Sequence, residues 1–336
     1  MSHQILITGG AGFIGGHLAR SLVEQGNFVR VIDNLSTGRK SNIADLLDHP
    51  HFEFVESDAA DESVLRPLCA DVDQAYHLAA TVGVALVAAD PIQTIETNIN
   101  LTQTLLKVLT EQNRRKPLRL YFASTSEVYG RNPARIWSED DELVFGPTTI
   151  GRWSYGLSKA IDEHLVLSCV RKYKLSAVVG RFFNVIGPRQ TGRYGMVLPR
   201  FVRAACANEP LVVYDDGSQQ RCFIHVLDVV EIIQRLMSAD AAVGQVVNIG
   251  SNESLSILEL AQKVIARTGS RSEIRFQPSR DVYGSDFEDC RWRTPDLTKL
   301  AGLIDYCRRY NLDDAIDQCR AELKNGKDDN GSAISL

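Results

Sequence analysis

The chain has 336 residues, of which 44% are hydrophobic and 24% are charged. At roughly 150 residues per domain, this length predicts about two domains, or one large domain that carries a smaller one, and the composition excludes a disordered chain, a fibrous repeat and a small disulfide-stapled domain. A formal net charge of −5 provides no basic field of the kind that attracts nucleic acid or an anionic membrane, so neither is expected as a partner.

The first half of the chain alternates short apolar segments with helical patterns. Strands that alternate with helices of this length form βαβ units, so we predict an α/β protein with a parallel sheet. The predicted strands are 4–8, 28–32, 52–56, 74–78, 118–123 and 175–181, and the clearest helices are 13–25, 94–111 and 155–172.

After Asn184 the sequence changes character, because glycine and proline recur within a short stretch at 187–199. Such clusters interrupt regular structure and favour a domain boundary. We predict a first domain over 1–184, a smaller mixed α/β domain over 185–321 and a flexible, polar tail over 322–336. Segments at about 217–250 are expected to return to the first domain. The later elements are predicted strands at 211–214 and 245–249 and helices at 226–237 and 257–268.

A glycine-rich turn follows the first strand and contains Gly9, Gly12 and Gly15. Glycines at this spacing let the backbone approach a pyrophosphate, and the following helix directs free N–H groups at it. Asp33 ends the next strand, where its carboxylate would bind a ribose diol and repel a 2′-phosphate, so we expect NAD rather than NADP. Asp58, just past the third strand, either binds the adenine amino group or is an ordinary loop carboxylate.

Tyr155 and Lys159 are four residues apart and therefore share one face of the predicted helix. A phenol with a pKa near 10 is a poor base at neutral pH, but a neighbouring ammonium group favours the phenolate. The pair suits removal of a proton from a hydroxyl group while hydride leaves the same carbon. Thr125 and Ser126 end a strand, where ligands bind in open α/β sheets; they either contact the reacting hydroxyl and Tyr155 or form a polar turn.

The seven cysteines are scattered and include no CxxC pair, which is typical of reduced thiols in a cytosolic protein. No Cys/His cluster has metal-ligand spacing, so no metal site is expected. The N-terminus resembles no signal peptide, and no apolar run approaches about 18 residues. We therefore expect a cytoplasmic protein. The cysteines are Cys69, Cys169, Cys206, Cys222, Cys290, Cys307 and Cys319.

Four signatures together resemble the extended short-chain dehydrogenase/reductase family of nucleotide-sugar epimerases, dehydratases and decarboxylases. They are TGGAGFIG at 8–15, Asp33 at a strand end, STSEVYG at 124–130 and YGLSK at 155–159. The resemblance covers about residues 4–321. It implies a Rossmann-type doubly wound parallel sheet, a smaller C-terminal substrate domain and NAD as cofactor. It also implies further cofactor contacts from Phe13, Ile14, Asn34, Ala79 and Asn98, besides those from Tyr155 and Lys159.

Within that family, the chain is most similar to the UDP-glucuronic acid decarboxylases. Glu127 stands where the family's 4-epimerases often carry serine, and Arg293 falls on the family's catalytic arginine. By the same resemblance Asn184, Arg221 and Arg293 bind the substrate. One departure is Met196, at a position where those decarboxylases carry an arginine; Arg193 or Arg200 is a candidate substitute.

The resemblance predicts that Tyr155 takes the proton of a sugar 4-hydroxyl, that the 4-keto product of UDP-glucuronic acid loses carbon dioxide, and that UDP-xylose is released. The alternatives are a UDP-sugar 4-epimerase and a 4,6-dehydratase, in which Glu127 acts at C5. A further alternative is a dinucleotide-binding regulator without activity, although such proteins tend to lack the Tyr/Lys pair. Helices at 94–111 and 155–172 pair into a four-helix bundle in dimers of this family, so a homodimer is expected.

Overall fold

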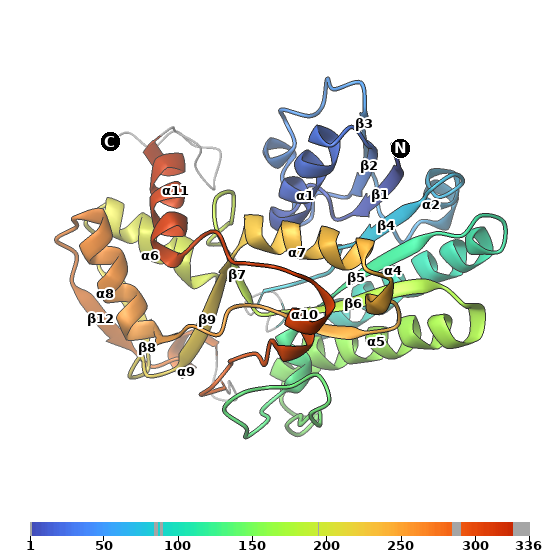
Figure 1. Ribbon diagram of the computed structural model, residues 1–336. Helices are drawn as coiled ribbons and strands as arrows, with labels where there is room; N and C mark the ends of the chain where they lie inside the picture. The colour runs from blue at the N-terminus through green and yellow to red at the C-terminus, as the bar shows by residue number, and fades with distance from the viewer. Residues whose placement is uncertain (1, 84–86, 88–89, 194, 284–289, 325–336) are drawn as a thin grey trace.

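The computed structural model describes residues 2–83, 87, 90–193, 195–283 and 290–324. Its centre is a seven-stranded sheet in which every paired strand runs parallel (Figure 1). In spatial order the strands are β10 (Val246–Ile249), β6 (Ser176–Phe182), β5 (Arg119–Thr125), β4 (Gln74–His77), β1 (Gln4–Thr8), β2 (Phe28–Asp33) and β3 (Phe52–Glu56). The predicted Rossmann-type doubly wound sheet is confirmed.

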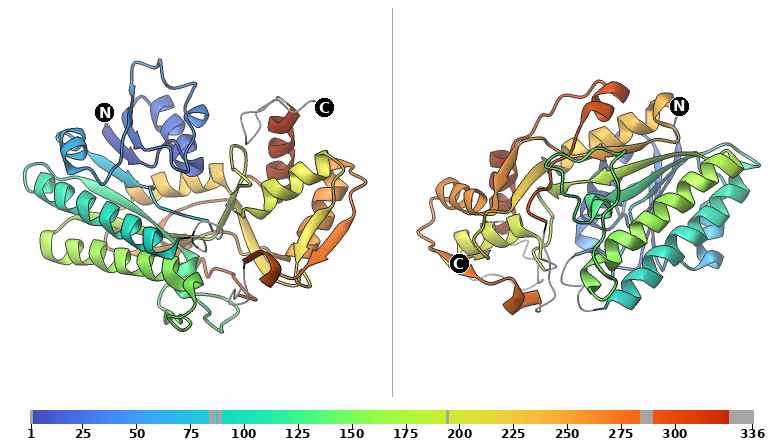
Figure 2. Two further views of the ribbon diagram at one scale, coloured as in Figure 1. Left: turned by 180° about the vertical axis from the view of Figure 1, so that it is seen from behind. Right: turned by 90° about the horizontal axis from the view of Figure 1, so that it is seen from below.

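Helices cover both faces of this sheet. One face is covered by α1 (Phe13–Glu24), α7 (Val226–Ser238) and α10 (Thr298–Leu303). The other face is covered by α2 (Glu62–Leu68), α4 (Pro91–Asn113) and α5 (Ser154–Tyr173). Consecutive residues Ile5, Leu6 and Ile7 are each at most 1% exposed, as expected for a strand that is buried on both sides. Helices α4 and α5 lie side by side in Figures 1 and 2.

The ends of α4 follow from its sequence. Asp90 accepts a hydrogen bond from the Gln93 N–H at 2.9 Å and so caps the first turn. Pro91 occupies the first helical position, where its missing N–H costs nothing. Buried leucines, including Leu101, Leu105 and Leu109, then recur on one side and face the sheet.

A smaller lobe stands beyond the carboxyl ends of the central strands (Figure 2). It contains a three-stranded sheet of β11 (Ser254–Ser256), β9 (Gln220–His225) and β7 (Asn184–Ile186) and a pair of β12 (Ile274–Gln277) and β8 (Leu211–Tyr214). Helices α6 (Val197–Cys206), α8 (Ile257–Thr268) and α11 (Leu312–Lys324) pack together around its own apolar core. A short helix, α9 (Arg280–Tyr283), precedes residues that lie outside the description.

The chain crosses between the two lobes more than once. Helix α7 packs on the central sheet and strand β10 forms its edge, whereas β9 pairs with β7 and β11 in the smaller lobe. Helix α11 ends at Lys324, so residues 322–324 are helical and not part of a tail; 325–336 lie outside the described residues.

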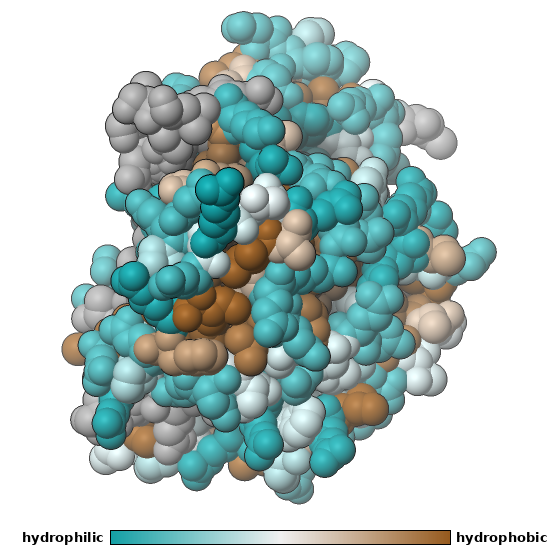
Figure 3. Space-filling model, turned by 90° about the vertical axis from the view of Figure 1, so that its left-hand side faces the viewer, coloured by the Kyte–Doolittle hydropathy of each residue, from teal (hydrophilic) through white to brown (hydrophobic). Residues whose placement is uncertain are grey.

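The molecular surface is mainly hydrophilic on the side shown in Figure 3, with one central group of hydrophobic residues. Among the large hydrophobic side chains that are exposed elsewhere, Ile92 and Ile95 belong to α4 and Ile161 to α5, with exposures of 70%, 38% and 45%. In the part of the chain that the structure describes, no helix is both long and apolar enough to cross a membrane.

Candidate active site

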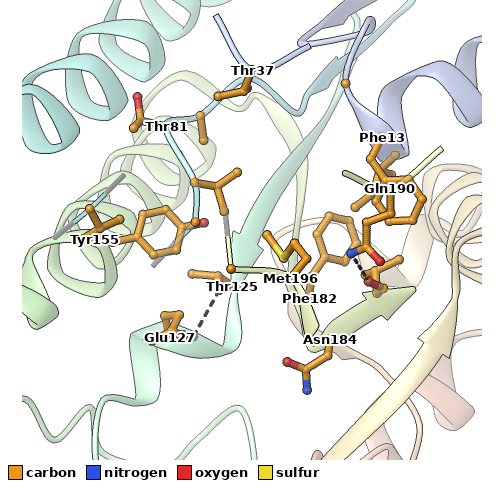
Figure 4. Close-up of a pocket in the computed structure, with 18 of the residues that line it drawn as sticks. Phe13, Thr37, Thr81, Thr125, Glu127, Tyr155, Phe182, Asn184, Gln190 and Met196 are labelled. Atoms are coloured by element: carbon orange, nitrogen blue, oxygen red, sulfur yellow. Dashed lines mark hydrogen bonds between the residues drawn. The ribbon is translucent and has the colours of Figure 1, made fainter. Parts of the chain in front are cut away.

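A cavity of about 600 Å³ lies between the carboxyl ends of the central strands and the smaller lobe (Figure 4). This is where ligands bind in open α/β sheets, because β1 pairs with both β2 and β4 and the connections diverge there. Most predicted site residues line it: Gly9, Gly12, Phe13, Ile14, Gly15, Asp33, Asn34, Asp58, Ala79, Thr125, Ser126, Glu127, Tyr155, Asn184, Arg221 and Arg293. Asn98, Lys159 and Arg193 do not.

The glycine-rich turn can accept only glycine at two positions. Gly9 has a φ of +73°, and a Cβ there would lie 2.6 Å from the Ala79 nitrogen. A Cβ on Gly15 would lie 2.3 Å from the Gly9 carbonyl oxygen. The turn thus brings the bare backbone to the cavity wall, immediately before the N-terminus of α1, whose N–H groups favour anions. This geometry suits a pyrophosphate, and we refer to Gly9–Gly15 as the cradle.

Asp33 lies beside that cradle and is 8% exposed. Its two carboxylate oxygens accept hydrogen bonds from the Ala11 N–H at 3.0 Å and the Leu35 N–H at 2.8 Å, which fix the side chain while lone pairs remain for a ligand. Burial raises the pKa of Asp33, and these two hydrogen bonds oppose the rise. Asn34 and Asp58 are exposed at the cavity edge.

Asn98 supports the site from behind rather than lining it. It is 1% exposed; its side-chain oxygen accepts the Thr81 N–H at 2.8 Å and its amide donates to the Ser158 hydroxyl at 3.1 Å. Thr81 does line the cavity. Asn98 therefore ties the segment after β4 to helix α5, and its contact with a cofactor stays a prediction.

Tyr155 lies in the first turn of helix α5 and directs its phenolic oxygen into the cavity (Figure 4). Thr125, at the end of β5, accepts the Glu127 N–H at 3.2 Å, and Ser126 beside it is 3% exposed. Burial raises the pKa of Tyr155 and the carboxylates of Glu127 and Asp162 raise it further, whereas a hydrogen bond with Thr125 lowers it. Strand end and helix start thus bring a phenol and two hydroxyls to one place.

Lys159 lies on α5, four residues after Tyr155, as the predicted helix requires. Its side chain is 2% exposed, lies outside the cavity lining and pairs with Asp162, with 3.5 Å between Nζ and Oδ2. Burial, Glu127 and Thr125 have the largest effects on the pKa of Tyr155. The lowering of this pKa by Lys159 stays a prediction. Asp162, the partner of Lys159, was not singled out from the sequence.

Glu127 is held between two arginines. Arg152 Nη2 lies 2.6 Å from Glu127 Oε2, and Arg293 Nη1 lies 2.8 Å from Glu127 Oε1. The three side chains are 8–12% exposed and all line the cavity. Burial alone would raise the pKa of Glu127, but the two guanidinium groups outweigh it and lower the pKa to about 2. Glu127 is consequently a carboxylate at neutral pH and not a proton donor.

Comparisons with known proteins agree with this geometry. Residues 5–250 match the profile described as the NAD dependent epimerase/dehydratase family. The chain belongs to that family. It is 38% identical over 307 residues to the UDP-N-acetyl-alpha-D-glucosaminuronate decarboxylase of Bacillus cytotoxicus, covering 91% of this chain and 93% of the relative.

Two further family members are informative. The chain is 36% identical to UDP-glucuronic acid decarboxylase 1 of Danio rerio, covering 90% of this chain and 68% of that one. The dTDP-glucose 4,6-dehydratase DesIV of Streptomyces venezuelae, whose structure contains NAD, superimposes with a TM-score of 0.85 at 27% identity, covering 96% of this chain and 98% of that one. The dependence of the family on NAD accords with the cradle and Asp33.

The smaller lobe supplies the far wall of the site in this family member. Arg221 is 7% exposed and donates to the backbone oxygens of Gln220 and Cys290 at 2.9 and 2.8 Å. The Asn184 amide donates to the Cys222 oxygen at 3.0 Å. Both line the cavity, where a guanidinium and an amide can bind the oxygens of a diphosphate.

The two arginines near Met196 lie differently with respect to the cavity. Arg193 is exposed and outside the cavity lining, and its contact with substrate stays a prediction. Arg200 lines the cavity and donates to the Tyr214 hydroxyl at 2.7 Å and to the Val212 oxygen at 3.0 Å. Met196 itself faces the cavity beside Phe182 (Figure 4).

Two residues at the site were missing from the sequence-based set. Arg152 lies three positions before Tyr155, and the sequence did not single it out. Asp162 lies three positions after Lys159, a spacing at which a lysine and a carboxylate on one helix can meet. Its burial, however, depends on the packing of α4 against α5, which no local pattern specifies.

Proposed function

We propose that the protein is an NAD-dependent decarboxylase of a UDP-uronic acid, with UDP-glucuronic acid as the first candidate. The observation that carries the proposal is the buried Arg152–Glu127–Arg293 cluster next to Tyr155. An epimerase or dehydrogenase site needs a base and a cofactor, whereas guanidinium groups at the reacting sugar suit a substrate that bears its own carboxylate. Decarboxylase relatives at 38% and 36% identity support the same choice.

The residues at the cradle fit NAD. Gly9 and Gly15 leave no space for a Cβ, and Asp33 lies where a ribose diol can bond to it. The cavity wall also includes Gly12, Phe13, Ile14, Asn34, Asp58 and Ala79. When bound, NAD supplies the acceptor and later the donor of a hydride at C4 of the sugar.

Side chains of the protein then carry out the proton transfers of the reaction. Tyr155 removes the proton of the 4-hydroxyl, and Thr125 or Ser126 bonds the same oxygen. Lys159, one helical turn from Tyr155, supplies positive charge that favours the phenolate. The 4-keto uronic acid is a β-keto acid, so the C5–C6 bond breaks with its electron pair moving to the ketone as an enolate, and carbon dioxide leaves.

C5 must next receive a proton. Since Glu127 is ionised, it orients the two arginines instead of donating, and the proton comes from water ordered by Arg293. Return of the hydride to C4 and of the proton from Tyr155 to the oxygen completes a cycle without net redox change.

Association into a homodimer is part of the proposal. Ile92, Ile95 and Ile161 expose apolar surface on α4 and α5, two helices that lie side by side. Exposed apolar groups on adjacent helices are typical of a face that pairs with a second copy.

The test is product identification. The purified protein is incubated with a substoichiometric amount of NAD and either UDP-glucuronic acid or UDP-N-acetylglucosaminuronic acid, and products are assigned by NMR and mass. We expect a UDP-pentose from one of the two acids, and none from the Tyr155→Phe variant. UDP-galacturonic acid as the product would instead establish a 4-epimerase, and no reaction with either acid would withdraw the acid-specific roles of Arg152 and Arg293.

A further inference from the structure

A second carboxylate lies close to the reaction machinery but outside the cavity. Asp162 has no exposed surface, and its Oδ2 lies 3.5 Å from Nζ of Lys159, itself 2% exposed. The Lys159 ammonium also lies over the Phe122 ring, 4.0 Å from its centroid. An ammonium group buried against an aromatic ring is costly to keep charged unless an anion accompanies it.

A row of polar side chains leads to Asp162 from the start of the cofactor cradle. Thr8, directly before Gly9, has its hydroxyl 2.7 Å from His77 Nδ1, and His77 Nε2 lies 3.3 Å from the Thr102 hydroxyl. Thr102 on α4 in turn contacts Asp162 and helps to hold its carboxylate ionised. Burial and Lys159 together lower the pKa of His77 to about 3, so this row carries no charge of its own.

The other ionisable groups that face Lys159 already have partners. Glu163 on α5 binds Arg181 of β6 with two hydrogen bonds, of 3.0 and 2.8 Å. His77 on β4 is neutral, and Tyr155 is a phenol whose pKa is raised by burial. Helix α4 contributes Thr102 and Asn98, neither of which ionises. Asp162 is therefore the counter-ion of Lys159 among the described residues.

Tyr155, Lys159 and Asp162 follow one another at intervals of four and three on α5, so they share one face of the helix with the lysine in the middle. Burial lowers the pKa of Lys159, and Asp162 opposes this. Burial likewise raises the pKa of Asp162, to about 6, and Lys159 opposes it. Each group thus maintains the charge of the other in the interior.

We propose that Asp162 is a positioning residue that keeps Lys159 protonated and fixes it on the Tyr155 side of helix α5. The inference rests on the proposed function in that it assigns Lys159 the task of favouring the Tyr155 phenolate. Its physical content is independent of the substrate, because the pairing of the two side chains is a property of the folded chain.

The first test needs no activity. In Asp162→Asn, Lys159 loses its counter-ion, so its pKa in the folded state falls further below the unfolded value. The unfolded chain then binds more protons than the folded one, and stability rises with pH. We expect the melting temperature of Asp162→Asn to lie furthest below wild type near pH 7 and to approach it by pH 9.5.

Two matched variants separate the effect of the Asp162 charge from the effect of changing its side chain. Asp162→Glu keeps the carboxylate and is expected to restore the wild-type dependence on pH, even if its melting temperature is lower. Lys159→Met/Asp162→Asn removes both charges and is expected to show no additional dependence on pH. If the melting temperature of Asp162→Asn lies below wild type by the same amount at every pH, the proposal is overturned. If Asp162→Asn does not fold, folding of the double variant supports the pairing, and failure of both variants contradicts it.

The second test uses the reaction. If Lys159 must be protonated, kcat/KM falls at high pH as it loses its proton. In Asp162→Asn this fall should begin at least about one pH unit lower, because an opposite charge within about 4–6 Å typically shifts a pKa by 1–3 units. An unchanged alkaline limb would contradict the proposal. If no UDP-uronic acid reacts even with wild type, the proposed function fails, while the melting curves still decide the role of Asp162.

Discussion

The replacement of Glu127 by glutamine tests the electrostatic description of the site. The change keeps the shape of the side chain but removes the charge between Arg152 and Arg293, whose side chains are 8% and 10% exposed. The pKa of Glu127 is lowered from 4.5 to about 2. At about 1.4 kcal/mol per pKa unit, this shift corresponds to roughly 3 kcal/mol of stabilisation at neutral pH. Removing one partner of a buried ion pair typically costs a similar 3–5 kcal/mol.

The assay is urea unfolding of wild type and Glu127→Gln at pH 7, followed by a pH series. We expect the variant to lose roughly 3 kcal/mol of unfolding free energy. Since the folded-state pKa is depressed, the stabilisation is fully present above the unfolded value of 4.5 and is lost as pH falls toward about 2. The difference between the two proteins should therefore be constant from pH 8 to 5 and shrink below pH 4.5.

A surface pair serves as the control. Glu53 lies 3.1 Å from Arg30 and is 45% exposed, so Glu53→Gln should cost less than about 1 kcal/mol. The reasoning is refuted if Glu127→Gln costs no more than this control, or if its cost increases as the pH is lowered.

Three further predictions concern the cofactor and the assembly. Gly15→Ala would place a Cβ 2.3 Å from a backbone oxygen, so we expect at least a tenfold loss of NAD affinity by calorimetry, whereas Gly302→Ala, with nothing within 4 Å, should bind as wild type does. Asp33→Ser removes the carboxylate that repels a 2′-phosphate, and the ratio of NAD to NADP affinity should fall; an unchanged ratio would remove Asp33 from the site. Ile92→Glu charges a side chain that is 70% exposed on α4, so light scattering should show a monomer instead of a dimer. The control Phe276→Glu on β12 should remain a dimer. Equal molecular masses for the two variants would contradict the α4 and α5 face as the dimer interface.

The central sheet could be predicted because its signals are local. Strands such as β1, β2 and β5 are short segments, largely apolar in β1 and β2, that end at a glycine-rich turn, an aspartate or hydroxyl residues, and burial on both faces makes the apolar run of β1 continuous. Residues 4–8 and 52–56 were predicted with the bounds that the structure has. Strands β7, β9 and β11 were not predicted, because their pairing joins short segments that are distant in the sequence.

In the candidate site, too, locally determined features could be predicted and contacts between distant segments could not. The glycine cradle, Asp33 and Tyr155 were predicted because backbone geometry and helix spacing fix them locally. The partners of Lys159 and Glu127 were not predicted, because they depend on which elements pack together. Arg293 reaches Glu127 across 166 residues, and Asp162 is buried only because α4 covers it. Sequence patterns therefore predicted the candidate reacting groups but not the charged side chains that surround them.

The most direct measurement of the central claim is the fate of the substrate carboxyl carbon. UDP-glucuronic acid labelled with 13C at C6 is incubated with the protein and a substoichiometric amount of NAD, and the label is followed by NMR. The account predicts that 13C appears as bicarbonate while an unlabelled UDP-pentose accumulates in equal amount, and that Tyr155→Phe releases none. Label that remains attached to a six-carbon UDP-sugar after turnover would contradict decarboxylation at this site.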